Sequence, residues 1–272
     1  MAFKASGPIV LVGAGNMGGA MLKGWLAAGI AGSDVVVLDP SPKPEMLELI
    51  GAYGIRHEAA APAGLTAGVL FVAVKPQMMA GVLPALRALK GAETVTVSIA
   101  AGTPVATIEA HLGAGAVVRA MPNTPAMVGR GITAAVPNAA VTPDQRRLVD
   151  ELLSVSGPVE WLDEEALIDA VTAVSGSGPA YAFFLVECMA EAGRAAGLPD
   201  DLAMRLARAT VSGAGEMLHV SDAPAETLRK NVTSPGGTTA AALSVLMAED
   251  GMKPLFVRAV AAAKKRAEEL AG

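Results

Sequence analysis

The sequence has few aromatic side chains, few histidines and a single cysteine. Aromatic residues make up 3% of the 272 residues and apolar residues 52%, so the cores are expected to consist of closely packed Ala, Val, Leu and Met. Ala-rich helices of this kind often continue across a subunit interface, and we therefore expect a homo-oligomer. The lone Cys188 excludes an internal disulfide and is typical of a reducing compartment. Because it lies in an apolar helical run, we expect it in a core.

Clustered positive charge and long apolar runs are also lacking. The net charge is −5 and no stripe of Lys and Arg appears, which argues against a nucleic-acid partner. No apolar run reaches the roughly 18 residues of a membrane span. The first residues, MAFKASGPIVLVGAGN, reach Gly and Asn too early for a signal peptide. We therefore expect a cytoplasmic chain without a membrane partner, and we predict no metal site.

Short apolar runs rich in Val and Ile recur through the first half of the chain, at 8–13, 35–39, 69–74, 94–100 and 116–121. The segments between them, such as MGGAMLKGWLAAG and MMAGVLPALRALKG at 78–91, have helical periodicity and are expected to be the crossover helices. Continuous apolar strands joined by helices are typical of a parallel sheet that is covered on both faces. The sequence therefore predicts an α/β fold with a doubly wound Rossmann-type sheet.

Strand-like runs disappear after Trp161. The remaining residues are predicted as helices separated by turns such as GLPDD and SPGG, and small or apolar residues recur at helical spacing in 199–218. We therefore place a domain boundary near Asp163. A dinucleotide-binding domain of residues 1–163 is expected to precede an all-α dimerisation and substrate domain of residues 164–272.

The glycine-rich turn GAGNMG at 13–18 follows the first apolar run and opens a helical segment. In this context the first glycine is expected to form the tight turn, the second to let a pyrophosphate approach, and the third to allow close helix packing. The turn therefore predicts a dinucleotide site. Its predicted cofactor contacts are Gly13, Gly15, Asn16, Met17 and Gly18.

Asp39 ends the second strand, where an acidic side chain commonly accepts hydrogen bonds from the ribose 2′-OH. Such a carboxylate repels a 2′-phosphate, whereas Ser41 and Lys43, which come directly after it, are suited to bind that phosphate. The segment DPSPK therefore leaves both NADP(H) and NAD(H) open as cofactors. A structural role, in which Asp39 caps a turn before Pro40, is an equal alternative.

Two proline-containing turns, KPQ at 75–77 and MPNTP at 121–125, follow later strands. Ligands of doubly wound sheets bind at the carboxyl ends of the strands. Prolines there fix the backbone and leave carbonyl and N–H groups exposed, which suits a flat amide-bearing ring. The turns are therefore candidates for the nicotinamide site, with ordinary loop chemistry as the alternative. The candidate contacts are Val74, Lys75, Pro76, Met121, Pro122, Asn123 and Thr124.

The second half is poor in groups that take a proton from an alcohol. No lysine occurs from Gly91 through Arg229, and His219 is expected at the surface near a helix end. A hydride acceptor that is already positive, such as a protonated imine, does not need such a base. The turn SPGGTT at 234–239 suits this acceptor. It offers a hydroxyl at Thr239, and for a carboxylate the backbone N–H groups of Ser234, Gly236 and Gly237.

Five motifs together resemble the pyrroline-5-carboxylate reductase family. They are GAGNMG at 13–18, AVKP at 73–76, RAMPNTPA at 119–126, VSGSGPAY at 174–181 and NVTSPGGTT at 231–239. In this order they are highly specific, and they cover nearly the whole chain. The resemblance implies reduction of 1-pyrroline-5-carboxylate to L-proline, the last step of proline biosynthesis, with NADPH or, in some members, NADH.

The resemblance also implies roles for individual residues. Thr239 matches the threonine whose hydroxyl meets the substrate nitrogen, and Lys75 lies at the nicotinamide, so these two are the catalytic candidates. The substrate-binding candidates are Ser234, Gly236, Gly237, Thr238 and Asp222, the last standing where some members have a glutamate. In this family the second domains of two chains intertwine, so that SPGGTT and the cofactor come from different chains of a homodimer. Some dimers assemble into decamers.

Two other functions compete with this interpretation. A 3-hydroxyacid dehydrogenase of similar build is disfavoured because GPAYAFFLVECMAEAG at 178–193 lacks the lysine that such enzymes place there. A non-catalytic NAD(P) sensor is disfavoured because the chain retains a full substrate turn.

Overall fold

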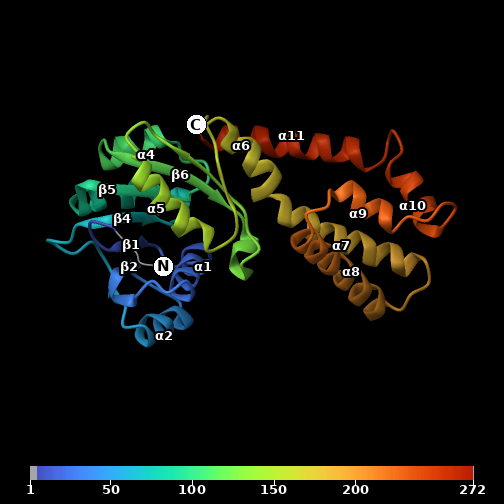
Figure 1. The fold of residues 1–272 in the computed structure, drawn as a ribbon, viewed down its shortest axis with the longest axis horizontal. Helices are drawn as coiled ribbons and strands as arrows, with labels where there is room; N and C mark the ends of the chain where they lie inside the picture. Colours follow the sequence, from blue (N-terminus) through green and yellow to red (C-terminus); the bar gives the residue numbers. More distant parts are fainter. Residues whose placement is uncertain (1–4, 272) are drawn as a thin grey trace. The chain divides into compact units, whose positions relative to one another are not determined.

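The computed structural model describes residues 5–271, which form two compact units (Figure 1). The first unit contains the chain through Gly176 together with the residues from Lys264 on, and the second is Ser177–Ala263. Strands occur in the first unit, whereas the second is helical. An α/β sheet followed by an all-α region is the fold class that the sequence predicts. The units divide at Gly176, beyond the predicted boundary at Asp163, because Ile168 packs on the sheet residues Ala134 and Val136.

The sheet of the first unit has eight strands in the order β3-β2-β1-β4-β5-β6-β7-β8. All neighbouring strands are parallel except β6 and β7, which are antiparallel. The strand order therefore runs outward from β1 in both directions, as in a doubly wound fold. The strands are β1 Ile9–Val12, β2 Val35–Leu38, β3 Arg56–Glu58, β4 Ala67–Val72, β5 Lys90–Ser98, β6 Ala116–Pro122, β7 Thr133–Pro137 and β8 Val159–Trp161.

Helices cover both faces of this sheet. Ile9 and Leu11 of β1 point to the face covered by α1, α2 and α5, while Val10 and Val12 point to the face covered by α3, α4 and the 3-10 turns beside α3. Because both faces are buried, the central strands are continuously apolar, as the sequence indicated. The helices of this unit are α1 Asn16–Ala27, α2 Pro44–Ala52, α3 Met79–Val82, α4 Val105–Leu112, α5 Pro143–Ser154 and α6 Leu167–Val171.

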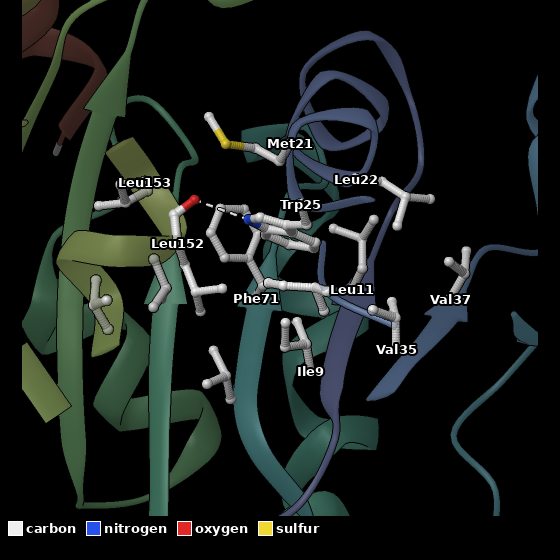
Figure 2. Packing of buried hydrophobic residues seen from close by; sticks show 14 of the residues in the cluster. Ile9, Leu11, Met21, Leu22, Trp25, Val35, Val37, Phe71, Leu152 and Leu153 are labelled. Atoms are coloured by element: carbon white, nitrogen blue, oxygen red, sulfur yellow. Dashed lines mark hydrogen bonds between the residues drawn. The ribbon is translucent and has the colours of Figure 1, made fainter. Parts of the chain in front are cut away.

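Trp25 of α1 is the largest side chain in the core beneath α1 and α5, and it is fully buried (Figure 2). Its ring meets Phe71 of β4 edge to face, with ring centroids 5.0 Å apart. The indole N–H donates to the carbonyl of Leu152 in α5 at 2.8 Å. Trp25 therefore fixes two helices against the strand whose carboxyl end borders the candidate site.

Replacing Trp25 with alanine is expected to lower the free energy of unfolding by about 3–5 kcal/mol, since it leaves a cavity and an unpaired carbonyl. Trp25→Phe keeps one aromatic ring and loses the indole N–H with its five-membered ring, so its cost is expected to be smaller than that of alanine. Urea unfolding of both variants measures the difference. A loss below about 1 kcal/mol for Trp25→Ala would contradict this packing role.

The second unit consists of α7 Gly178–Ala195, α8 Asp200–Val220, α9 Ala225–Asn231, α10 Thr238–Leu246 and the greater part of α11 Met252–Ala271. Its buried residues are Ala190, Ala203 and Ala207 alone. Large apolar side chains are exposed along its helices, among them Phe183 at 65% and Val220 at 72%. These exposed apolar side chains along the helices mark an association surface.

Two expectations concern this unit. Cys188 of α7 is exposed in the single chain, so its assignment to a core was wrong: the apolar run around it lies on a helix that has little core to enter. His219 is exposed in the last turn of α8, as expected. No helix in the part of the chain that the structure describes has the length and apolar content of a membrane span.

Candidate functional site

The glycine turn after β1 has the geometry that the sequence assigned to it. Gly13 has a φ of +89°, which favours glycine. A Cβ on Gly18 would lie 2.1 Å from the carbonyl oxygen of Gly13, so the absence of a side chain lets α1 approach the turn. Gly15, in contrast, has nothing within 4 Å of its would-be Cβ. The open side of the turn is therefore at Gly15, where a ligand can reach the backbone.

Helix α1 begins directly after Gly15, with no side-chain cap and no acidic residue in its first turn. Its first amides, at Asn16 and Met17, thus face no carboxylate of their own helix. A helix N-terminus in this state favours an anion, such as a pyrophosphate.

A cavity of about 490 Å³ lies along the carboxyl ends of β1, β2 and β4. One wall comes from the glycine turn and β2, and the opposite wall from the segment after β4, including Val74 and Lys75. The remaining lining is mostly apolar, with Ala59–Ala61 and Leu86 among its residues. A second hollow of about 110 Å³ shares Gly15 with it. The shape and lining suit a flat, partly apolar ligand with a phosphate at the glycine turn.

Asp39, which lines this cavity, is bound on both carboxylate oxygens. Oδ2 accepts the N–H of Ala14 at 2.8 Å, and Oδ1 accepts the N–H of Ser41 at 2.9 Å. The first bond ties β2 to the glycine turn, and the second closes the turn before Pro42. The turn-capping role weighed for Asp39 is therefore present in the structure.

Lys43, at the start of α2, lies across the small hollow from α1. Its ammonium donates to Asn16 Oδ1 at 2.8 Å. Both residues line the hollow beside Gly15. A positive charge thus lies next to the start of α1, on the side of the DPSPK segment.

The segment after β4 places Val74 and Lys75 in the wall of the cavity, and Pro76 begins a 3-10 turn. Lys75 is exposed, and no hydrogen-bond or ion-pair partner of its ammonium is found among residues 5–271. The side chain therefore stays available to a ligand at this edge.

The segment at the end of β6 is held from within. Asn123 Oδ1 accepts the N–H of Ile132 at 3.0 Å, and its carbonyl accepts the N–H of Ala126 at 3.1 Å. Met121 packs with its side chain on the cluster of Ala134, Val136 and Ile168. Pro122 is buried and Thr124 exposed. The side chain of Met121 thus lies inward, and its backbone is paired with Ala134 of β7.

The predicted substrate turn lies in the second unit, directly before α10. Gly236 has a φ of +68° and follows Pro235, and the N–H of Gly237 donates to the carbonyl of Ser234 at 3.1 Å. This is the pattern of a type II turn, which requires glycine at its third position. The N–H of Gly237, which the sequence assigned to a carboxylate, is used inside the turn.

Helix α10 starts at Thr238 with no side-chain cap and no acidic residue in its first turn. The backbone N–H groups of Thr238 and Thr239, rather than that of Gly237, are therefore available to bind an anion. Thr239 is half-buried, and Thr238 and Asp222 are exposed. In residues 5–271 no group of three or more His, Cys, Asp or Glu side chains is arranged to hold a metal ion.

Sequence reasoning missed three parts of this site. It did not place the Ala14 amide on Asp39, the Lys43 ammonium on Asn16, or the cavity wall formed by Ala59–Ala61. Ala59–Ala61 follow a short edge strand and carry no chemical motif. In the sequence, the one signal for a contact between β2 and the glycine turn was Asp39, the acidic residue at the end of β2.

A doubly wound sheet whose first strand ends in this glycine turn, beside a cavity at the carboxyl edge, defines a nicotinamide-dinucleotide-dependent oxidoreductase. Residues 8–102 match the family model described as NADP oxidoreductase, coenzyme F420-dependent, and residues 165–270 match that described as pyrroline-5-carboxylate reductase dimerisation. These matches, together with a pyrroline-5-carboxylate reductase that is 42% identical over 97% of this chain, show that the chain belongs to the pyrroline-5-carboxylate reductase family.

Similar proteins support this assignment along the whole chain. Pyrroline-5-carboxylate reductase of Pseudomonas aeruginosa is 42% identical over 265 residues, covering 97% of this chain and 96% of that protein. The enzyme of that name from Mycobacterium tuberculosis is 41% identical over 286 residues, with 96% of each chain covered. A solved structure of a pyrroline-5-carboxylate reductase from Coxiella burnetii superposes with a TM-score of 0.90 at 34% identity, covering 98% of this chain and 99% of that one. Plasmodium falciparum pyrroline carboxylate reductase, solved with NADP bound, gives a TM-score of 0.78 at 27% identity, covering 98% and 99%.

Proposed function

We propose that this chain reduces 1-pyrroline-5-carboxylate to L-proline with NAD(P)H. The observation that carries the proposal is the likeness to pyrroline-5-carboxylate reductases over nearly the full length of both chains. When bound, the nicotinamide supplies a hydride to C5 of the imine, and the ring nitrogen keeps a proton as the C=N bond becomes a C–N bond.

The first unit is proposed to hold the cofactor. The amides at the start of α1, beside the open Gly15, bind the pyrophosphate, and the apolar cavity receives the adenosine. Gly13 and Gly18 act indirectly, since they shape the turn. The nicotinamide lies against Val74, Lys75 and Pro76 and against the segment Met121–Thr124. Lys75, exposed at the cavity wall, supplies a positive charge at that edge.

The second unit is proposed to hold the substrate. A helix N-terminus contributes about 0.3–1 kcal/mol to an exposed charge and about 2 kcal/mol when partly buried. Direct hydrogen bonds from the amides of Ser234, Gly236, Thr238 and Thr239 therefore carry most of the carboxylate anchoring. The Thr239 hydroxyl meets the ring nitrogen, directly or through water, and Asp222 faces the same amine. No strong base is needed, because the acceptor carbon is already electron-poor.

The exposed apolar helices of the second unit support a homo-oligomer. We propose a homodimer, in which the turn of one chain completes the cofactor site of the other, in the cytoplasm. Light scattering with mass determination distinguishes this dimer from a decamer of five such pairs.

NADPH is the proposed preferred cofactor, with its 2′-phosphate at Ser41 and Lys43. Both oxygens of Asp39 already accept backbone N–H groups, so this carboxylate is held by the turn in the free protein. Replacing Lys43 with alanine is expected to weaken NADPH binding about tenfold, which is about 1.4 kcal/mol, and to change NADH binding less than about twofold. Fluorescence titration of each cofactor measures this.

Lys23→Ala is the matched control, because Lys23 lines the same hollow and carries the same charge. Equal weakening of both cofactors by Lys43→Ala would contradict the proposal. That result would mean that Lys43 acts through Asn16 and the glycine turn.

The test of the activity is the absorbance of the reduced nicotinamide with the imine and each cofactor in turn. Oxidation that depends on the imine supports the proposal. Oxidation of 3-hydroxyisobutyrate instead would favour a hydroxyacid dehydrogenase, and binding of NADPH without turnover of the imine would favour a sensor.

A further inference from the structure

An ion pair between a buried arginine and a glutamate that is 33% exposed lies on the face of the sheet covered by α3 and α4, and no role has been assigned to it. Arg119 of β6 is 4% exposed, and its Nη1 donates to Glu165 Oε1 at 2.8 Å. The same oxygen accepts the N–H of Val105, the first residue of α4, also at 2.8 Å. One carboxylate oxygen thus joins three segments: a strand, a helix start and the loop before α6.

The position of Arg119 in the strand connects this pair to the cofactor edge. Arg119 is paired with Ser98, the last residue of β5, and lies two residues before Met121. Side chains in a strand alternate between faces, so Arg119 and Met121 point to the same side of the sheet. The ion pair therefore fixes the part of β6 that leads directly into the segment Met121–Thr124.

The second partner of Glu165 is Val105, which begins the helix that follows the neighbouring strand β5. Helix α4 follows β5 through the short connection 99–104, and its N-cap Pro104 makes no side-chain cap. A carboxylate at that end satisfies an otherwise orphan N–H and favours the helix dipole. Because β5 and β6 are parallel, their carboxyl ends lie at the same edge, and Glu165 links the segments that leave these two strand ends.

Stability alone does not explain an ion pair at this position, because apolar side chains of similar volume commonly stabilise a fold as well as a buried ion pair does. The same strand face carries Val117 and Met121, which are apolar. The contribution of Arg119 is a directional bond that fixes one distance between the two strand ends.

We propose that Arg119 and Glu165 are positioning residues of the reductase, which set the nicotinamide-facing segment Met121–Thr124 after β6 relative to the start of α4, the helix that follows β5. This inference rests on the proposed placement of the nicotinamide at Met121–Thr124. The adenosine cavity, which lies along β1, β2 and β4, does not depend on the pair.

The test compares two ligands on Glu165→Ala. The reduced cofactor contains the nicotinamide, whereas 2′-phospho-ADP-ribose is the same molecule without that ring. We expect Glu165→Ala to weaken NADPH binding at least tenfold and to change binding of 2′-phospho-ADP-ribose less than twofold. Glu165→Gln, which keeps an acceptor oxygen for Val105, is expected to fall between the wild type and the alanine variant.

Arg147→Gln is the matched control, since it removes an ion pair with Asp144 that is exposed on α5. Equal loss of affinity for both ligands, or a lower melting temperature with both affinities unchanged, would overturn the proposal. If Glu165→Ala does not fold, the same comparison on Glu165→Gln decides. Binding is measured without the imine, so a chain that binds NADPH but does not reduce the imine refutes the proposed activity and leaves this test intact.

Discussion

Replacing Gly18 with alanine is expected to lower the stability of the protein, whereas replacing Gly15 with alanine is expected to lower its affinity for the cofactor. At Gly18 the new Cβ would meet the Gly13 carbonyl at 2.1 Å, and backbone cannot give way as a flexible side chain can. We expect a loss of about 2 kcal/mol of stability, being about 3 kcal/mol of overpacking less about 1 kcal/mol gained from the helix propensity of alanine. At Gly15 the backbone is extended and the space is open, so the free protein is expected to keep its stability within about 0.5 kcal/mol.

For cofactor affinity, the larger loss is expected in Gly15→Ala, the variant that keeps its stability. Gly15→Ala is expected to weaken NADPH binding by about 10- to 100-fold, or about 1.4–2.8 kcal/mol, because the methyl group occupies the place of the pyrophosphate. Thermal unfolding without ligand and fluorescence titration with NADPH separate the two quantities. Normal affinity in Gly15→Ala would show that the pyrophosphate does not approach the open side of the turn.

Thr239→Ala is expected to lower turnover of the imine by about 100-fold while the dissociation constant for NADPH stays within twofold. The hydroxyl is proposed to meet the nitrogen whose charge and protonation change in the reaction, and removing one such donor costs about 2.7–4 kcal/mol in well-studied enzymes. Alanine has the higher helix propensity, so the start of α10 is not weakened by the change. Steady-state rates with saturating NADPH give the measurement.

Thr239→Ser is the matched control, since it keeps the hydroxyl and removes only a methyl group. It is expected to retain turnover within about tenfold, a smaller loss than that from removing the donor. An unchanged rate in Thr239→Ala would remove Thr239 from the mechanism. A rate lost equally in both variants would indicate that the packing of the methyl group, rather than the hydroxyl, determines turnover.

Five buried strands could be predicted from the sequence because each is a continuous apolar run: β1, β2, β4, β5 and β6. The buried strand β7, Thr133–Pro137, was not among the predicted runs. The edge strand β3 escaped because Arg56–Glu58 is polar and only three residues long. The crossover predicted at 78–91 is a short α3 followed by 3-10 turns over Leu83–Leu89. Pro84 lacks the N–H that a continuing α-helix requires.

The candidate site was likewise predictable only where its chemistry lies in neighbouring residues of the sequence. The glycine turn was predictable since its chemistry lies in consecutive residues, and the structure gives Gly13 and Gly18 the expected geometry. The orientation of Met121 and the use of the Gly237 N–H were not, because they depend on which neighbour the folded chain supplies. The bond from Arg119 to Glu165 spans 46 residues and two elements, and no local pattern announces it.

The scarcity of buried side chains in the second unit has a thermodynamic consequence. Three buried alanines cannot offset the conformational entropy of ordering its helices. We therefore expect folding and assembly of this unit to be coupled by mass action, so that association with further copies adds to the stability of its helices. Dilution would thus dismantle the half that carries SPGGTT before the sheet loses its order.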